Sequence, residues 1–230
     1  MIADAVVPAL DEASAIGGVI DSLPRGLIRR IVVCDNGSRD GTGDVARARG
    51  ATVVREERRG YGSACLAGLA VMRLDPPEAV LFLDADGSDD PRDAVALLAP
   101  IAEGRADLVI GSRTLGRREP GALTPQARFG NWLATGLIHR FYGARWTDLG
   151  PFRAVRWSAL ERLAMRDPDF GWTVEMQVKA ARAKLRSFEV PVSYRRRIGR
   201  SKISGTLTGA SRAGAKILGT IAFDLIRGGR

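Results

Sequence analysis

Short apolar runs rich in β-branched residues alternate with amphipathic segments along the first half of this chain. Strands are predicted at residues 5–8, 31–34, 52–55, 79–83 and 108–110. Helices are predicted between them at residues 11–23, 41–50, 63–73 and 93–102. The first of these helices has a clear apolar stripe, formed by Ile16, Val19, Ile20 and Leu23. Because strands and helices alternate, we expect a parallel α/β sheet with helices on both faces.

The second half of the chain has a different pattern. Residues 113–126 are rich in Gly, Pro and Arg and show no periodicity, so we interpret them as a loop and, at this length, as a candidate lid. Helices are predicted at 128–142, 158–164, 173–183 and 208–227, with a strand at 187–194 and a basic loop at 195–204.

Composition limits the class of protein. A chain of 230 residues with 45% apolar and 27% charged residues can bury a core of one or two domains. The longest apolar stretch, residues 217–226, is shorter than the roughly 20 residues that span a bilayer. Cys34 and Cys65 have no metal-site spacing, and the first residues do not resemble a signal peptide. We therefore expect reduced thiols and a cytoplasmic protein.

The net charge of +9 predicts attraction to polyanions. Nucleic acid, phosphorylated small molecules and an anionic membrane surface are all polyanionic. The basic residues are not interleaved with aromatic residues and form no known nucleic-acid-binding motif, so nucleic acid is not an expected partner.

Two carboxylates follow the most apolar predicted strand. Asp84 and Asp86 come directly after residues 79–83, and open parallel sheets bind ligands at this end of their strands. Oxygen ligands in this arrangement favour a hard divalent cation, Mg²⁺ or Mn²⁺. The alternative is an acidic turn that caps the next helix, and Asp89, Asp90 and Pro91 are typical of such a cap.

Two more polar elements follow predicted strands. Residues 35–42 contain Asp35 and Asp40 among Asn-Gly and Asp-Gly turn formers, and residues 8–12 contain Pro8, Leu10 and Glu12. Taken singly, residues 35–42 are better explained as an ordinary strand-to-helix turn, and residues 8–12 as the start of a helix.

In their order along the chain, these elements resemble the family 2 glycosyltransferases of the GT-A fold. Residues 8–12 match P-x-x-(N/D)-E, residues 35–42 match D-(D/N)-x-S-x-D-G-T, and Asp84 and Asp86 match the DxD motif. Residues 60–69 match G-x-G-x-A-x-x-x-G-L. Further likeness to dolichyl- or polyprenyl-phosphate sugar synthases is carried by residues 84–91, 111–113, 128, 147–153, 190–194 and 199–202. The sequence departs from the pattern at Ser88, where an amide is usual, and at Asp11, where Asn is common.

The resemblance implies a GT-A type three-layer α/β sandwich with a mostly parallel central sheet. It implies one catalytic domain, residues 1–205, with a nucleotide-sugar half at 1–112 and an acceptor half at 113–205. Residues 206–230 would then form a C-terminal amphipathic helix, which is typical either of a membrane-surface helix or of one that packs on its own domain.

The resemblance also implies inverting transfer of a sugar from a donor of the GDP-mannose or UDP-glucose type. The metal would be held by Asp84 and Asp86. The donor would be bound by Pro8, Leu10, Glu12, Asp35, Asp40 and Asp84. The acceptor or its phosphate would be bound by Arg113, Arg128, Arg197, Arg200, Ser201 and Lys202.

The acceptor decides whether a general base is needed. A polyprenyl phosphate is already an anionic nucleophile near neutral pH, because its second pKa is about 6. A hydroxyl acceptor needs a base, and the resemblance implies Glu175 in that catalytic role. We favour the lipid phosphate, bound at a membrane surface. A nucleotidyltransferase is less favoured, because residues 9–15 lack a basic, Gly-rich loop.

Overall fold

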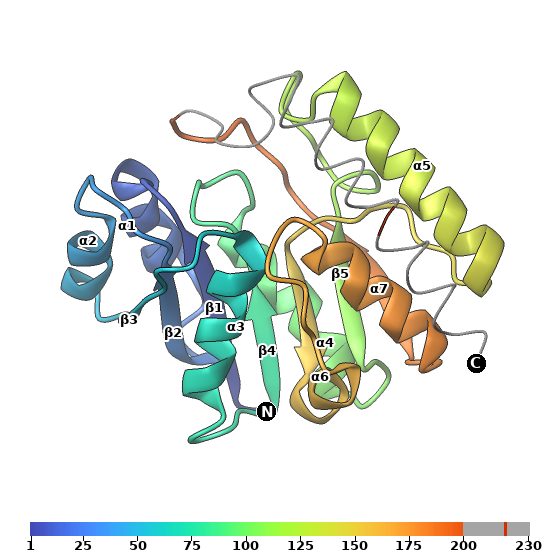
Figure 1. Cartoon of the computed structure of the whole chain (residues 1–230), viewed down its shortest axis with the longest axis horizontal. Coiled ribbons are helices and arrows are strands. Elements are labelled where there is room, and N and C mark those ends of the chain that lie inside the picture. Colours follow the sequence, from blue (N-terminus) through green and yellow to red (C-terminus); the bar gives the residue numbers. More distant parts are fainter. Residues whose placement is uncertain (200–218, 220–230) are drawn as a thin grey trace.

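The protein forms one seven-stranded sheet with helices on both faces (Figure 1). The computed structural model describes residues 1–199 and 219. The strands are β1 Ala3–Ala9, β2 Ile28–Asp35, β3 Thr52–Arg55, β4 Ala79–Phe82, β5 Leu108–Ser112, β6 Arg153–Arg156 and β7 Ser187–Pro191. The helices are α1 Ala13–Ser22, α2 Thr42–Ala48, α3 Tyr61–Met72, α4 Ala94–Ala102, α5 Pro125–Tyr142, α6 Trp157–Leu163 and α7 Trp172–Arg182, with a 3-10 turn at Pro91–Asp93.

The strand order is β3-β2-β1-β4-β6-β5-β7. Every paired strand is parallel to its neighbour except β6, which runs antiparallel to both β4 and β5. The mostly parallel α/β sandwich expected from the sequence is therefore confirmed. Strand β6 was not predicted from the sequence, because its apolar residues Ala154 and Val155 lie between two arginines.

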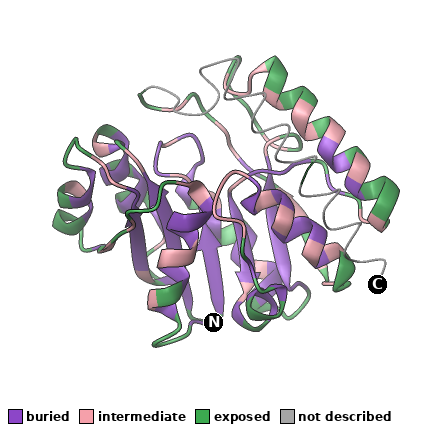
Figure 2. Cartoon of the chain, in the orientation of Figure 1, coloured by how far each residue is buried: buried purple, intermediate pink, exposed green. Residues whose placement is uncertain are grey.

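Alternate residues of the strands face two separate cores, as the period of two in a strand requires. Val6 and Phe82 pack with α3, α5, α6 and α7 on one face, whereas Val7 and Leu81 pack with α1, α2 and α4 on the other. Figure 2 shows the central strands β1, β4 and β5 buried and the outward side of α5 exposed, whereas β3 and β7 at the edges of the sheet are partly exposed.

Helix α5 begins three residues before its predicted start. Thr124 accepts a hydrogen bond from the backbone N–H of Ala127 at 3.2 Å, and Pro125 occupies the first turn, where its missing N–H costs nothing. The loop before α5 is fastened to the segment after β7: Tyr194 donates its N–H to Arg117, and Glu119 donates to Tyr194. Movement of this loop as a lid stays a prediction.

No helix within residues 1–199 is long and apolar enough to cross a bilayer. The predicted helix at 208–227, and with it the C-terminal element at 206–230, falls outside the described residues apart from Gly219.

Candidate active site

A cavity of about 390 Å³ opens where β1, β2 and β4 end. Six of the residues singled out from the sequence line it: Pro8, Leu10, Glu12, Asp84, Asp86 and Arg197. They come from three distant parts of the chain. The carboxyl ends of the parallel strands bring them together, as expected for a ligand site of an open α/β sheet.

Asp84 lies just beyond β4 and Asp86 follows it. The Oδ1 atom of Asp84 is buried and has no hydrogen-bond partner among the described residues. Burial and the nearby charge of Asp86 raise the pKa of Asp84, although the guanidinium groups of Arg113 and Arg197 act in the opposite direction. Asp86 accepts a hydrogen bond from the backbone N–H of Ser88 at 2.9 Å, which fixes one of its carboxylate oxygens.

Arg197 bridges two acidic residues of the cavity. Its guanidinium is paired with Glu12 and lies 3.3 Å from the Oδ2 atom of Asp86. The neighbouring Ile198 donates its backbone N–H to the carbonyl of Asp86 at 2.9 Å, so the basic segment is held at this point of the cavity. The Nε atom of Arg197 is buried and has no hydrogen-bond partner in the described chain.

The β2–α2 loop is shaped by its own carboxylates. Asp40 accepts hydrogen bonds from the N–H groups of Ala13 at 2.9 Å and Thr42 at 3.0 Å. Burial acts to raise the pKa of Asp40, but these bonds and the Thr42 hydroxyl lower it overall. Asp35 accepts from the N–H of Ser38 at 2.7 Å. Neither carboxylate is among the residues that line the cavity.

Several lining residues were not among those singled out from the sequence: Asn36, Arg59, Tyr61, Asp169 and Phe170. Asn36 donates to the carbonyls of Glu56 and Arg58 and accepts from the N–H of Gly60, which ties β2 to the start of α3. Asp169 and Phe170 belong to the loop of residues 164–171, between α6 and α7. Their local signal, an acidic turn with a proline, only marks the approach of a helix.

Glu175 lies outside the cavity lining, on the first turn of α7. Its carboxylate accepts hydrogen bonds from the backbone N–H groups of Arg166 at 3.1 Å and Asp167 at 2.8 Å. It also forms an ion pair with Lys179 at 2.7 Å. In this arrangement the carboxylate holds the 164–171 loop.

Arg113 forms a buried bidentate ion pair with Asp148, with N–O distances of 2.8 and 2.7 Å. Its guanidinium also lies over the ring of Tyr194, 5.1 Å from the centroid. Although burial acts in the opposite direction, the charge of Asp148 raises the pKa of Arg113 above its ordinary value. Arg128 is exposed on the first turn of α5 and is not among the residues that line the cavity. Arg200, Ser201 and Lys202 lie outside the described residues.

Solved structures with the same architecture define the class of fold. Mannosyl-3-phosphoglycerate synthase from Rubrobacter xylanophilus superposes with a TM-score of 0.78 at 22% identity, covering 100% of this chain and 75% of that one. Glucosyl-3-phosphoglycerate synthase from Mycobacterium tuberculosis, in complex with Mn²⁺, UDP-glucose and phosphoglyceric acid, gives a TM-score of 0.73 at 25% identity, with 96% and 80% covered. The fold is that of the GT-A glycosyltransferases.

Sequence comparison places the chain within that class. Residues 4–164 match the profile of glycosyl transferase family 2. An uncharacterized glycosyltransferase of Mycobacterium tuberculosis is 39% identical over 207 residues, covering 89% of this chain and 91% of the relative. Undecaprenyl-phosphate mannosyltransferase of Micrococcus luteus is 30% identical, covering 89% and 88%. Dolichyl-phosphate hexose transferase of Haloferax volcanii is also 30% identical, covering 90% and 88%. The chain belongs to glycosyl transferase family 2 and is a glycosyltransferase.

Proposed function

We propose that this enzyme transfers a hexose, with inversion, from a nucleotide sugar to the phosphate of a polyprenyl or dolichyl lipid. The observation that carries the proposal is the cavity in which Asp84 and Asp86 meet the loops after β1 and β2. The names of two relatives, an undecaprenyl-phosphate mannosyltransferase and a dolichyl-phosphate hexose transferase, support the acceptor class. The donor would be of the GDP-mannose or UDP-glucose type.

A divalent cation, Mg²⁺ or Mn²⁺, fits the two carboxylates. The Oδ1 atom of Asp84 is buried without a hydrogen-bond partner among the described residues, which is costly unless a cation or proton is present. Within that part of the chain no third His, Cys, Asp or Glu joins them in a metal-binding cluster, so the other ligands would be donor oxygens and water. When bound, such a cation supplies Lewis-acid charge to the diphosphate leaving group.

Protein side chains would bind the nucleoside and the diphosphate of the donor. Pro8, Leu10 and Glu12 line the end of the cavity after β1, where we place the nucleoside. Asp35 and Asp40 would shape that end through the β2–α2 loop. Arg197 has an unused N–H donor at Nε beside Asp86, and a guanidinium binds phosphate oxygens well. Arg200, Ser201 and Lys202 follow it in sequence and would extend this phosphate-binding segment.

The environment of Glu175 supports a phosphate acceptor. Its carboxylate is already bound by two backbone N–H groups and Lys179, so it is poorly available as a general base. A phosphate needs no deprotonation near neutral pH. The acceptor phosphate would approach Arg113 and Arg128. A hydroxyl acceptor on a phosphorylated small molecule is the second candidate, favoured by the fold shared with glucosyl-3-phosphoglycerate synthase.

A lipid acceptor calls for a surface that meets the membrane. Phe129 and Trp132 on α5 are 61% and 67% exposed, and their ring centroids are 5.8 Å apart. Arg128 and Arg140 are exposed on the same helix. Aromatic side chains with basic neighbours are typical of peripheral helices on anionic lipid surfaces, which supports peripheral membrane association.

The test is an acceptor competition. The protein is incubated with UDP-glucose or GDP-mannose, a divalent cation, and either polyprenyl phosphate or 3-phosphoglycerate. We expect the glycolipid product. Arg128→Ala should lower kcat/KM for the lipid phosphate by about 10- to 100-fold, the size of a lost hydrogen bond to a charged group, while nucleotide affinity is unchanged.

The matched control is Arg162→Ala, an exposed arginine on α6. It should leave both parameters as in the wild type. Exclusive transfer to 3-phosphoglycerate would establish the second candidate instead. Equal losses in donor affinity and lipid transfer for Arg128→Ala would remove this residue from the acceptor site.

A further inference from the structure

We propose that Asp169 recognises hydroxyl groups of the donor sugar, and that Glu175 is a positioning residue for the loop that carries it. This inference rests on the proposed function, because it assumes a nucleotide sugar in the cavity. It assigns to Glu175 a role other than that of a base.

Asp169 has the properties of a ligand-binding carboxylate. It lines the same cavity as Asp84 and Asp86 and is only partly buried. Among the described residues, no hydrogen bond or ion pair engages its carboxylate, whereas its own N–H is donated to Asp167 at 2.8 Å. A carboxylate accepts hydrogen bonds and repels phosphate. The groups of a nucleotide sugar that it would bind are therefore hydroxyl groups, which donate hydrogen bonds.

The place of Asp169 in the cavity points to the hexose. In the proposed binding mode, the nucleoside lies at the β1 and β2 end, and the diphosphate lies at Asp84, Asp86 and Arg197. The sugar must then extend past the diphosphate, towards residues contributed by the second half of the chain. In the cavity, the lining residues of that half that are not already placed at the diphosphate are Asp169 and Phe170. Phe170 offers an apolar face beside the carboxylate, a combination common in sites that bind small ligands.

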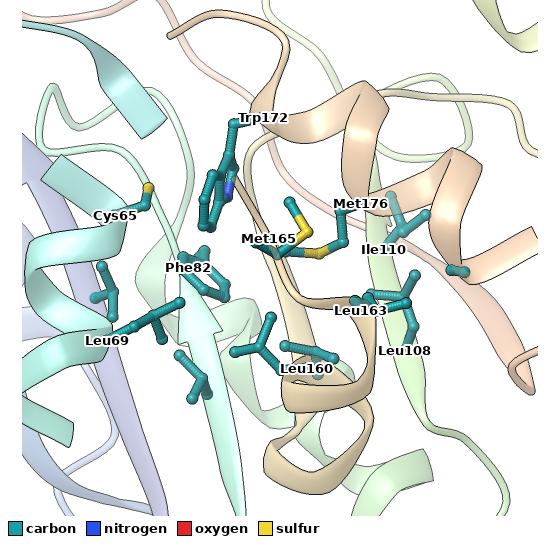
Figure 3. Close-up of a cluster of buried hydrophobic side chains, with 14 of the residues drawn as sticks. Cys65, Leu69, Phe82, Leu108, Ile110, Leu160, Leu163, Met165, Trp172 and Met176 are labelled. Carbon is teal, nitrogen blue, oxygen red and sulfur yellow. The ribbon is translucent and has the colours of Figure 1, made fainter. Parts of the chain in front are cut away.

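The loop that carries Asp169 is held at its base by α7. Glu175 accepts hydrogen bonds from the N–H groups of Arg166 and Asp167, and Lys179 donates to the carbonyl of Ala164 at 2.7 Å. Trp172, at the start of α7, packs on Phe82 of β4 with ring centroids 6.0 Å apart (Figure 3). The loop is therefore anchored to the strand that precedes Asp84.

The same loop is pressed against α3. Ser63 donates its backbone N–H to the carbonyl of Pro168 at 2.8 Å. A Cβ atom at Gly60 or Gly62 would collide with the backbone of Pro168 or Asp167, and Gly60 has a φ of 140°. Only glycine permits this approach without displacement. Because the loop is fixed on both sides, Asp169 is held in place before the donor binds, which lowers the entropic cost of recognition.

The test compares binding of nucleotides with binding of nucleotide sugars. Calorimetry with Mn²⁺ measures UDP, GDP, UDP-glucose and GDP-mannose against the wild type, Asp169→Ala and Asp169→Asn. We expect both variants to bind the preferred nucleotide sugar about 10- to 100-fold more weakly, and the matching nucleotide within about twofold of the wild type. Glu161→Gln, an exposed acid on α6, is the control and should change neither affinity.

Glu175→Gln tests the positioning role through a double-mutant cycle. Alone, it should weaken nucleotide-sugar binding but not nucleotide binding; in the Asp169→Ala background it should add little, because both changes remove the same interaction. A purely structural role would weaken all ligands additively.

Each outcome distinguishes the inference from the proposed function. If the wild type binds no nucleotide or nucleotide sugar, the proposed function fails. If the wild type binds both but Asp169→Ala binds them as the wild type does, only the inference fails. Equal weakening of UDP and UDP-glucose would place Asp169 at the ribose and overturn the assignment to the hexose.

Discussion

The two cysteines illustrate what burial does to a single residue. Cys34 and Cys65 are both fully buried, on β2 and α3. Burial raises the pKa of Cys34 to about 12 and that of Cys65 well above its ordinary value. Because the thiolate is the reactive form, both groups stay protonated and inert at pH 8.

We therefore expect no reaction of the folded protein with a disulfide reagent at pH 8 and rapid reaction of both thiols in guanidinium chloride. Free thiols in an unfolded chain ionise near pH 8.5. The raised pKa values therefore contribute fully to the free energy of unfolding below about pH 8.5. This contribution is lost as the pH rises from there towards the folded-state pKa of Cys34, about 12. Rapid labelling of the native protein would show that α3 opens from the sheet.

Asp86 allows a direct test of the metal site. Asp86→Ala removes one of the two proposed metal ligands. We therefore expect the affinity of this variant for UDP or GDP in the presence of Mn²⁺ to be as low as that of the wild type in EDTA. Transfer should be abolished. The exposed Asp44→Ala is the matched control, since it loses only a surface pair with Arg47, and it should bind nucleotide normally. Full nucleotide affinity of the wild type in EDTA would contradict a metal role.

The site residues that can be predicted from the sequence are those whose position follows from the end of a strand. Asp84 and Asp86 were predictable because a buried strand delivers them, and Pro8 and Glu12 for the same reason. Asp169 was not, because its place in the cavity depends on contact between the 164–171 loop and α3, which are distant in sequence. Glu175 could be named from the resemblance alone. Its partners, the backbone N–H groups of Arg166 and Asp167 and the side chain of Lys179, could not be predicted, because they depend on how the loop folds back on α7.

The backbone of the 164–171 loop limits the size of the side chains at the start of α3. Gly62→Ala places a Cβ atom against the carbonyl of Asp167, and the loop must then move away from the helix. We expect weaker nucleotide-sugar binding and a loss of about 1–3 kcal/mol in the free energy of unfolding, as found for overpacked sites. Urea unfolding and calorimetry measure the two effects.

Gly18→Ala is the matched control. Gly18 lies inside α1, and no atom of the described residues is within 4 Å of its added Cβ atom. This change should stabilise the protein by about 0.5–1 kcal/mol, because alanine favours a helix over glycine. If both variants were stabilised, the 164–171 loop would not restrict the side chain at position 62 in solution.

The elements themselves were largely predictable, because the apolar periods of helices and strands are strong in this sequence. Strand β6 is the exception. Its four residues begin with Arg153, whose buried guanidinium donates to the carbonyls of Leu149 and Thr173 at 3.1 and 3.0 Å. These partners make a buried arginine acceptable, and the bond to Thr173, twenty residues away in sequence, is revealed by no local pattern.

For the whole molecule, charge and exposed aromatic rings make membrane association testable. We expect sedimentation with vesicles containing phosphatidylglycerol and much less with phosphatidylcholine alone, with binding weakened by salt. The double variant Phe129→Ser and Trp132→Ser should bind at least about tenfold more weakly, because two apolar side chains no longer enter the interface.

Leu74→Ser is the control for this measurement. Leu74 is 88% exposed, just beyond the end of α3, and is remote in sequence from α5. Its replacement should leave vesicle binding unchanged. Equal losses in the two variants would indicate non-specific adsorption, and binding unaffected by either change would remove α5 from the membrane surface.

Strand β6 has a consequence for how this enzyme can be recombined. It comes from the second half of the chain, yet it lies between β4 and β5 of the first half. A chimera that exchanges residues 113–199 with a relative therefore replaces a strand in the middle of the sheet, bonded on both edges, and its new side chains must match two unchanged neighbours. We therefore expect that exchanging residues 113–199, which make up most of the proposed acceptor half, will not by itself transfer acceptor preference between relatives. That preference would have to be altered by substitutions in loops, with the native β6 retained.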